Sequence, residues 1–580
     1  MNSSGFFKGI HDVISTDVLV IGAGGAGLRA AMEASDNGVN VLVVCKGKFT
    51  KTGSTFFPLV PGWGIQFLKE EKGKNTYDYF FEEILEVGEG MALPELAKIL
   101  VEQAPERVHD LEKMGIKFNK VGGKFYEYLC CFSNVKRTMA PALDIDNIQR
   151  NFKNEILKRD IRVIEDFFVI KIIVKEEGKS KKVCGAVGID KNGNMVFIKS
   201  KAVILASGGG SIIFKNNMNS PELTGDGYEL ALDAGASLIN MEYIQYIYGI
   251  VAPKKIHFSE KVFTYNPPVI NSAGENFIER YIPENLSIDE IISKRIEHGP
   301  FTSRLISKYY DIAIYSEIRN GKGTKKDAIL LDLRDLPEHI NNIEKEFHGA
   351  IKWYEWLGKK GIDIQEDLIE IALCAHANNG GINVDTNTIS EVDGLFACGE
   401  IMGGPHGADR QGGNMMAATQ VFGKIAGENA AIYSKNCCET WVDEDDILLE
   451  VNEKIKLNKN GSQNYKNIES ELQNATSEEL VICRREKGLK KLINKLEGDL
   501  YKKIVLLKID KTSDIKNYFT LKSMLKTALI IANAALMRKE SRGSHHREDY
   551  PEKDDKEFRK VIKINRENNK NIYKFVKLSF

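Results

Sequence analysis

Three glycines at the end of a short apolar run constrain the fold of this chain more than any other feature. The run at 17–21, DVLVI, is rich in valine and isoleucine and stops at glycine, which is typical of a buried parallel strand. The glycines follow with the spacing G-x-G-x-x-G, at Gly22, Gly24 and Gly27. Such a turn needs glycine where φ is positive, lets the backbone approach a pyrophosphate, and aims the free N–H groups of a helix at the anion. The sequence therefore predicts a dinucleotide-binding turn, with a simple tight turn as the alternative.

The residues on either side complete a βαβ unit of about thirty residues. An alanine-rich helix is expected at 26–37 and a second strand at 39–44. Later apolar runs at 201–205 and 394–398 are expected to return to the same sheet. The predicted fold class is α/β, with a doubly wound, Rossmann-like nucleotide-binding domain. The second strand ends in Val-Cys-Lys rather than in an acidic residue, which argues against a standard NAD fingerprint.

Length and composition limit the rest of the fold and the partners. At 580 residues the chain exceeds the size of one hydrophobic core, so about two to four structural units are expected. The net charge of -1 gives no reason to expect nucleic acid as a partner. The nine cysteines include no CxxC pair, so neither a metal nor an iron–sulfur cluster is expected on this chain. With no secretory h-region and no apolar run of about 18 residues, a cytoplasmic chain without a transmembrane segment is expected.

Changes in amino-acid composition along the sequence divide the chain into units. Tyr-, Lys- and Asn-rich sequence beyond residue 250 indicates an inserted unit, interpreted as an α+β capping domain at 251–365. The nucleotide-binding domain then comprises 1–250 and 366–433. Glu, Lys, Asn and Leu recur at helical spacing over 434–501, which predicts exposed helices. We therefore assign 434–580 to a C-terminal helical domain.

Eight distinctive segments follow one another along the chain. They read VCKGKFTKTGSTFFPLVPGWGI at 44–65, LASGGG at 205–210, TGDGYELALDAGA at 224–236, GENFIERY at 274–281, NNGGI at 378–382, GLFACGE at 394–400, HGADRQGGN at 406–414 and ESRGSHHREDYP at 540–551. In this order they resemble the flavoprotein subunits of fumarate reductase and succinate dehydrogenase, and the first also resembles L-aspartate oxidase. The resemblance covers nearly the whole chain and implies an FAD-dependent oxidoreductase.

The resemblance also implies which residues contact FAD. Glycines of the turn would hold the pyrophosphate, and polar residues of the segment after the second strand would lie along the FAD. Two carboxylates would accept hydrogen bonds from the ribose or adjoining hydroxyls, and one asparagine would lie near the isoalloxazine. These residues are Gly22, Gly24, Gly27, Lys46, Ser54, Thr55, Gly208, Asp226, Glu400 and Asn414. No histidine occurs between Lys46 and Gln66, where the family attaches flavin covalently, so non-covalent FAD is expected.

The substrate pattern of the family is kept only in part. Family members bind a dicarboxylate with two histidines and two arginines, and His376 and Arg410 match one of each. An arginine fork suits a planar carboxylate. A core histidine and a structural ion pair are the respective alternatives. The second histidine of the family is replaced by Ile247.

The arginine that transfers a proton in the family is also displaced. Gapless alignment puts Ser307 at its position, and a three-residue shift puts Arg304 there. Lys308 lies beside the gapless position, so either cation could carry the proton, and the remaining alternative is that no cation occupies the site. With two cationic positions changed, the pocket should no longer favour a dianion.

We therefore expect a small substrate with one carboxylate, held by Arg410 and His376. Its apolar or aromatic remainder would face Ile247 and three tyrosines, although the tyrosines could equally be packing residues. The tyrosines are Tyr246, Tyr248 and Tyr265. The reaction class implied is hydride transfer between flavin N5 and a substrate carbon, with a side chain moving a proton on the neighbouring carbon. The capping domain would close over the site to exclude water.

The route of the electrons is open at this stage. A partner subunit with iron–sulfur clusters, a soluble donor and oxygen are the alternatives, so the chain could be an electron-transfer subunit of a larger complex, a flavin oxidase or a flavin-binding protein without turnover. An iron–sulfur partner could hold it at the inner face of a membrane, and an oligomer is compatible with the sequence. The segment 540–551 lies close to that partner in the family. A solvated ion-pair network around His545, His546, Arg547 and Asp549 is its other interpretation.

Overall fold

The computed structural model describes residues 6–178, 180–346, 349–366, 368–438, 440, 442–456 and 460–578. The first five and last two residues, at the ends of the predicted first and last units, lie outside this part.

One mixed sheet carries the nucleotide-binding core, with the strand order β6-β2-β1-β9-β8-β7 and with β17 beside β9. Its bounds are β1 Asp12–Ile21, β2 Val41–Val44, β6 Arg162–Ile164, β7 Phe168–Glu177, β8 Ser180–Ile189, β9 Met195–Leu205 and β17 Leu395–Ala397. The strands β6, β2, β1, β9 and β17 are parallel. The predicted return of 201–205 and 394–398 to the sheet of the first strand is confirmed.

The register brings the carboxyl ends of these parallel strands together. Ile21 pairs with both Val44 and Leu205, and Ala397 pairs with Leu205. In open parallel sheets ligands bind outside these carboxyl ends. The segments that follow the four strands are therefore the ones positioned to build a ligand site.

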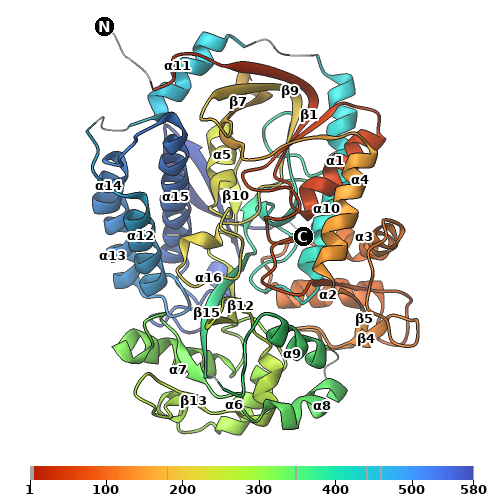
Figure 1. Cartoon of the computed structure of the whole chain (residues 1–580), viewed down its shortest axis with the longest axis vertical. Helices are drawn as coiled ribbons and strands as arrows, with labels where there is room; N and C mark the ends of the chain where they lie inside the picture. The colour runs from red at the N-terminus through yellow and green to blue at the C-terminus, as the bar shows by residue number, and fades with distance from the viewer. Residues whose placement is uncertain are drawn as a thin grey trace.

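Helices with small residues cover this sheet closely. Helix α1 (Gly25–Asp36) packs against α10 (Asn414–Asn436), as Figure 1 shows. A Cβ at Gly427 would lie 2.3 Å from the carbonyl oxygen of Ala30, so this approach requires glycine. Further helices and a three-stranded antiparallel sheet complete the unit. They are α2 Tyr77–Val87, α3 Pro94–Lys113, α4 Ile145–Lys158, β3 Trp63–Phe67, β4 Tyr126–Tyr128 and β5 Arg137–Ala142.

The predicted capping segment forms the lower part of Figure 1, in green. Its antiparallel sheet has the order β12-β11-β15-β14-β13. The bounds are β11 Ile244–Ala252, β12 Ile256–His257, β13 Val269–Ile270, β14 Ile329–Leu331, β15 Ile369–Asn378, α6 Ile288–Arg295, α7 Lys308–Glu317, α8 Leu336–Glu346 and α9 Ala350–Lys359. Strand β11 crosses the predicted boundary at 251, and β15 lies wholly beyond the predicted boundary at 365, so the central strands of the cap sheet fall mostly within the predicted nucleotide-binding domain.

The C-terminal region is helical up to residue 558 and then changes. Its helices are α11 Glu444–Lys454, α12 Tyr465–Glu479, α13 Glu486–Lys495, α14 Tyr501–Val505, α15 Ile515–Met537 and α16 Asp555–Phe558. Strands β18 (Val561–Glu567) and β19 (Lys570–Val576) then form a sheet with β10 (Leu238–Ile239) and β16 (Gly381–Ile382). The predicted C-terminal helical domain therefore also contains the strands β18 and β19, where Val561, Ile562 and Ile564 are buried.

In the part of the chain that the structure describes, one helix is apolar enough to cross a membrane by length and composition alone. The stretch Thr512–Met537 has a mean hydropathy of 1.3 in its most apolar window, of which 67% is buried inside the protein. Figure 1 shows the helix α15, which this stretch contains, among α12, α13 and α14. The same composition suits the central helix of a folded unit, so this feature is weak evidence for a span.

The charged segment at 540–551 is buried from Glu540 to Arg547, whereas Asp549 and Pro551 are exposed. Glu540 and Arg547 are 0% exposed, and Arg538 pairs with both Glu242 (2.7 Å) and Glu540 (2.8 Å). Nη1 of Arg484 lies 2.6 Å from Nδ1 of His545. Because Arg484 can only donate, Nδ1 accepts and the proton lies on Nε2, which donates to the backbone at 3.2 Å. The interpretation as a solvated network was therefore wrong for His545, His546 and Arg547, which are buried, although Arg547 does pair with the exposed Asp549 at 2.7 Å.

Candidate functional site

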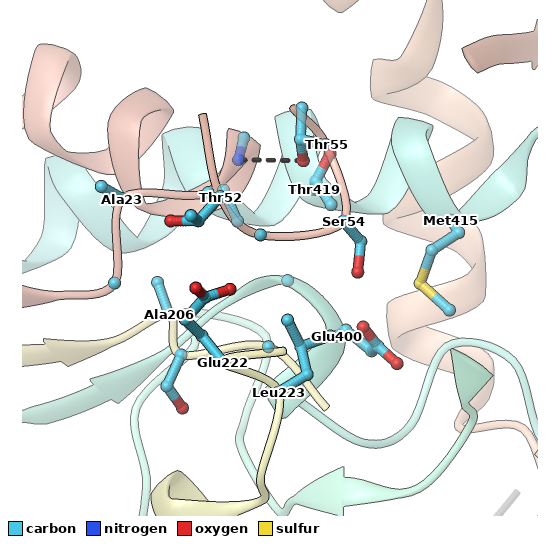
Figure 2. A pocket seen from close by; sticks show the side chains of 18 of the residues that line it. Ala23, Thr52, Ser54, Thr55, Ala206, Glu222, Leu223, Glu400, Met415 and Thr419 are labelled. Carbon is cyan, nitrogen blue, oxygen red and sulfur yellow. Dashed lines mark hydrogen bonds between the residues drawn. The ribbon is translucent and has the colours of Figure 1, made fainter. Parts of the chain in front are cut away.

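A cavity of about 470 Å³ opens at the carboxyl ends of β1, β2, β9 and β17 and reaches the cap sheet. That volume is in the range of cofactor and small-molecule sites. Figure 2 shows the loop with Thr52, Ser54 and Thr55 on one side and Ala206, Glu222 and Leu223 on the other. Most of the predicted site residues line it. They are Gly22, Gly24, Lys46, Ser54, Thr55, Gly208, Asp226, His376, Glu400 and Arg410.

The three glycines of the turn have different physical roles. Gly22 has φ +117°, and a Cβ there would lie 2.2 Å from the carbonyl oxygen of Ala206. A Cβ at Gly27 would lie 2.0 Å from the carbonyl oxygen of Gly22, so Gly27 lets α1 approach the turn although it does not line the cavity. Gly24 is the N-cap of α1 and lines the cavity, and a Cβ there meets nothing within 4 Å. The absence of a side chain at Gly24 leaves space for a ligand at the helix N-terminus.

The loop after β2 closes over this turn. The N–H of Gly25 donates to Oγ1 of Thr55 at 3.1 Å, the dashed line in Figure 2. The hydroxyl of Ser54 donates to Oδ1 of Asn219 at 2.7 Å. These contacts fix the loop that the sequence placed along the cofactor, and both side chains face the cavity.

Charged groups at the far side of the turn form a second cluster. Nζ of Lys46 lies 2.8 Å from Oδ1 of Asp226 and 2.6 Å from Oγ1 of Thr224. Asp226 begins helix α5 (Asp226–Ala234) after Gly225, whose φ is +77°. Glu222 also lines the cavity here, and sequence reasoning missed it because it lies just before the 224–236 segment. We call these glycines and charges the nucleotide end of the cavity.

Glu400 lies between the two ends of the cavity, directly after β17. Its Oε1 accepts the backbone N–H of Asn378 at 3.0 Å, and the N–H of Gly209 also points to this carboxyl. Burial raises the pKa of Glu400 to about 7, against these hydrogen bonds, which lower it. The carboxyl can therefore accept or donate a hydrogen bond to a ligand hydroxyl near neutral pH.

Arg410 presents a buried positive charge at the cap side. It is 7% exposed, and its Nε donates to Oε1 of Gln245 at 2.9 Å while Nη1 donates to the carbonyl oxygen of Gln411 at 3.0 Å. Within the described residues no carboxylate pairs with it. Burial lowers the pKa of Arg410, which nevertheless stays charged. A guanidinium held only by neutral groups in a cavity is suited to an anionic ligand.

His376 lies beside Arg410 at a bulge of β15. The register shifts from Gln245–Ala377 to Tyr246–Ala375, which leaves His376 as the extra residue. Its Nδ1 is buried without a hydrogen-bond partner in the described part of the chain. Burial and then the charge of Arg410 lower the pKa of His376 to about 3, so the ring is neutral.

A second histidine reaches the cavity from a place that sequence reasoning missed. His257 ends β12, next to β11 in the cap sheet, and lines the cavity together with His376 and Arg410. Burial lowers its pKa, and the nearby Glu260 opposes that shift. No motif marks it, because the segment around it departs from the family pattern. We call these three residues the cap end of the cavity.

The remaining predicted residues lie outside the cavity lining. Arg304 donates from Nε to Oδ2 of Asp409 at 3.0 Å, and the hydroxyl of Ser307 lies 2.8 Å from Nε2 of His298. Asn414 is buried at the start of α10, between Gly413 and Met415, which do line the cavity.

The tyrosines proposed to face the substrate do not. The hydroxyl of Tyr246 donates to the carbonyl of Leu480 at 3.2 Å, and that of Tyr248 donates to Asp311 at 2.6 Å. Tyr265 stacks on a cap histidine with ring centroids 4.5 Å apart. Alternation along β11 explains the first two, because Gln245 and Ile247 take the opposite face. The substrate-facing interpretation of these tyrosines was therefore wrong.

Comparison with known proteins agrees with this site. The FAD binding domain family matches residues 17–416, and the family described as fumarate reductase flavoprotein C-term matches 469–579. This chain belongs to the fumarate reductase and succinate dehydrogenase flavoprotein family. It is accordingly an FAD-dependent oxidoreductase, and the expectation from sequence on family, fold class and cofactor is confirmed.

Two methanogen proteins and two solved structures illustrate the likeness. An uncharacterized FAD-dependent oxidoreductase of Methanocaldococcus jannaschii is 33% identical over 551 residues, which cover 93% of this chain and 94% of the relative. One subunit of the fumarate reductase (CoM/CoB) of Methanothermobacter marburgensis is 32% identical, covering 96% and 98%. The structure of Mycobacterium smegmatis Sdh1 in complex with UQ1 has a TM-score of 0.81 at 28% identity, covering 98% and 95%. A variant of the E. coli quinol fumarate reductase FrdA also has a TM-score of 0.81, at 25% identity, covering 98% and 97%.

The residues present fit FAD. Gly24 leaves a bare helix N-terminus for phosphate, and the carboxylates of Glu222 and Asp226 can accept hydrogen bonds from hydroxyls. Two buried polar atoms of lining residues, Oγ of Ser207 and Nε1 of Trp63, have no partner within the described chain. Such atoms are normally satisfied, so they mark where a polar ligand belongs. Bound FAD supplies a two-electron hydride donor and acceptor at this site.

Proposed function

We propose that this chain transfers hydride between FAD and a carbon of a small substrate whose carboxylate is bound by Arg410 and His376. The observation that carries the proposal is the buried, carboxylate-free guanidinium of Arg410 in the same cavity as the glycine turn. Gln245 fixes Arg410 through two hydrogen bonds, since its Oε1 accepts from Nε of the guanidinium and its Nε2 donates to the backbone carbonyl of Arg410 at 3.1 Å. The fork is thus oriented before any ligand arrives.

We further propose that the substrate carries a single carboxylate. At the cap end only Arg410 has a formal charge, because the low pKa of His376 keeps that ring neutral and burial also lowers the pKa of His257. A second carboxylate would lose its hydration without gaining a cation. Ile247, at the position of the family histidine, lies in an apolar cluster with Met218 and Cys374 outside the cavity lining, so that position supplies no second cation. These features disfavour a second anion.

The cap supplies the walls that exclude water. The backbone N–H of His257 donates to the carbonyl of Leu59 at 2.8 Å, which ties the cap sheet to the loop after Thr55. The indole of Trp353 in α9 donates to the carbonyl of His257 at 3.1 Å. A closed cap raises the strength of the Arg410–carboxylate interaction, because less water competes for either group.

A carboxylate screen tests the proposal. The purified chain, with its flavin reduced by dithionite, is mixed with fumarate, crotonate and cinnamate, and the oxidised form with succinate, butyrate and 3-phenylpropanoate. We expect flavin reoxidation or bleaching with a monocarboxylate. Arg410→Ala should weaken binding of that monocarboxylate about 30-fold or more while FAD stays bound, as expected for loss of a charge-assisted pair.

The matched control is Arg150→Ala, which removes an exposed arginine from α4. Turnover of fumarate or succinate with no response to any monocarboxylate would overturn the single-carboxylate proposal. Loss of FAD from Arg410→Ala, with carboxylate binding retained, would overturn the assignment of Arg410.

A second candidate function is that of an electron-transfer subunit with an iron–sulfur partner. The relatives named as subunits of fumarate reductases favour it. Within the described residues no group of three or more His, Cys, Asp and Glu side chains could hold a metal. Co-purification of a cysteine-rich protein with acid-labile sulfide would support this function. Hydrogen peroxide release in the same screen would instead support the oxidase alternative.

A further inference from the structure

The proton that accompanies hydride transfer needs a carrier in the cavity, and the positions suggested by the family do not supply one. Arg304 is bonded to Asp409, and Ser307 is fully buried against His298. Nζ of Lys308 donates to the carbonyl of Ser303 at 3.4 Å. None of these three lines the cavity. Another side chain of this protein must therefore reach the substrate.

Eight ionisable side chains line the cavity within the described residues. They are Cys45, Lys46, Glu222, Asp226, His257, His376, Glu400 and Arg410. Lys46, Glu222 and Asp226 belong to the nucleotide end, and the thiol of Cys45 donates to the carbonyl of Gly47 at 3.3 Å. Glu400, whose Oε1 accepts the N–H of Asn378, is assigned to a ligand hydroxyl. His376 and Arg410 adjoin each other and form the carboxylate site of the proposed function. His257 is the one that remains without an assignment.

The backbone of His257 is fixed on three sides. Its strand partner across β11 is Gly249, its N–H bonds the carbonyl of Leu59, and its carbonyl accepts from Trp353. No hydrogen bond to its imidazole is present within the described chain, and the residue lines the cavity. The strand β11 separates it from His376 on β15, so the two histidines reach the cavity from different strands of one sheet. This is the arrangement of a positioned ring with a free nitrogen.

We propose that His257 is the catalytic acid–base residue of this chain. The proposal rests on the proposed function. In the oxidative direction the imidazole takes up the proton released when one C–H bond of the substrate breaks, and the neighbouring C–H bond releases a hydride, for which bound FAD would supply the acceptor. A carbon–carbon double bond forms between the two carbons. In the reductive direction the same bonds form and break in reverse, and the imidazolium gives the proton back.

The charges around His257 set the pH at which it acts. Burial lowers its pKa below the ordinary value, Glu260 in the segment after β12 opposes the shift, and His376 on β15 faces it as a neutral ring. The groups that approach it from α9 and from the loop at Leu59 are uncharged. The ring is therefore neutral at pH 7 and ready to accept a proton. Oxidation should speed up as pH rises through the lowered pKa, and reduction should slow down over the same range.

The test compares His257→Gln with the exposed His109→Gln on α3, both as holoenzymes, with cinnamate and fumarate as probes for reduction and 3-phenylpropanoate and succinate for oxidation. For His257→Gln we expect kcat to fall about 100-fold or more and the acidic limb of the oxidation profile to disappear. The Kd of the probes, read from perturbation of the flavin absorbance, should stay within about threefold. His109→Gln should match the parent protein.

A readout that needs no turnover is the ring signal of His257 in 13C-histidine-labelled holoenzyme, assigned by its loss in His257→Gln. We expect it to titrate below the ordinary histidine pKa and to move when cinnamate or fumarate binds. An immobile signal, or a His257→Gln enzyme with weaker binding and normal kcat, would overturn the proton-transfer role. So would loss of the pH limb in Arg304→Gln or Glu400→Gln but not in His257→Gln. A parent protein that turns over none of the probes refutes the proposed function itself, and with it this role.

Discussion

Two glycines of the phosphate turn should respond to the same substitution in opposite ways. Gly24 has φ −77° and ψ −179°, which alanine can adopt, and its added Cβ would meet no atom of the protein within 4 Å. At Gly27 the added Cβ would lie 2.0 Å from the carbonyl oxygen of Gly22 and 3.1 Å from Cβ of Ala206. Gly24→Ala therefore fills ligand space, and Gly27→Ala forces α1 away from the turn.

The magnitudes follow from these distances. Gly24→Ala should leave the FAD-free protein as stable as before or about 0.4–1 kcal/mol more stable, because alanine restricts the unfolded chain. It should displace the pyrophosphate and lose one charge-assisted hydrogen bond of about 1.5–3 kcal/mol, a weakening of FAD binding of about 10- to 150-fold. Gly27→Ala should destabilise the FAD-free protein by about 1–3 kcal/mol, the usual cost of overpacking.

The assay separates stability from ligand binding. Each variant is stripped of flavin, its urea unfolding is followed by circular dichroism, and FAD is then titrated with tryptophan fluorescence as the signal. Gly38→Ala is unsuitable as a control because its φ is +73°, whereas Gly358→Ala in α9 has open space around it and lies in the cap. Parent-like FAD affinity in Gly24→Ala, or parent-like stability in Gly27→Ala, would refute this division of roles.

Three further outcomes are expected. The stability advantage of Glu400→Gln over the parent FAD-free protein should grow as pH rises. The pKa of Glu400 is about 7 in the folded parent and 4.5 in the unfolded chain, so the parent is most stable below pH 4.5 and loses about 3 kcal/mol as the pH rises through 7. Urea unfolding at several pH values measures this difference. Ile247→His should destabilise the protein by about 1–3 kcal/mol, because it puts an imidazole in the apolar cluster with Met218 and Cys374, and urea unfolding measures that loss. Arg304→Ala should unfold at a lower temperature at pH 8 than at pH 6, because the buried carboxylate of Asp409 then keeps only its hydrogen bond from Thr302. Thermal unfolding at the two pH values measures the difference.

The sheet core could be predicted from the sequence because its signals are local. The strands at 17–21, 201–205 and 394–398 are apolar runs that stop at glycine or small residues, and each follows the pattern of a buried parallel strand. Strands β18 and β19 have no such signal. Their sequence alternates with lysine, and only the pairing of β18 with β10, more than three hundred residues earlier, buries one face.

The nucleotide end could be predicted and the cap end only partly. Glycine spacing is a backbone requirement that leaves a readable pattern, so most of the expected cofactor residues line the cavity. A substrate-binding side chain is defined by its position in the folded protein and need not belong to a sequence motif. His257 lies on a two-residue strand outside any motif. Arg304 and Ser307 lie near a motif position, but hydrogen bonds to Asp409 and His298 hold them outside the cavity lining.

The separation of Asp409 from Arg410 explains why the cavity retains a free cation. The two residues are adjacent in sequence, yet Oδ2 of Asp409 accepts from Thr302 at 2.6 Å and from Arg304 at 3.0 Å, both in the cap segment. Burial raises the pKa of Asp409 to about 7, and Arg304 opposes that shift. A carboxylate turned toward Arg410 would have neutralised the guanidinium and removed its affinity for a substrate anion. By holding Asp409 on the other side, Arg304 keeps Arg410 available, so a cation outside the cavity can control anion binding within it.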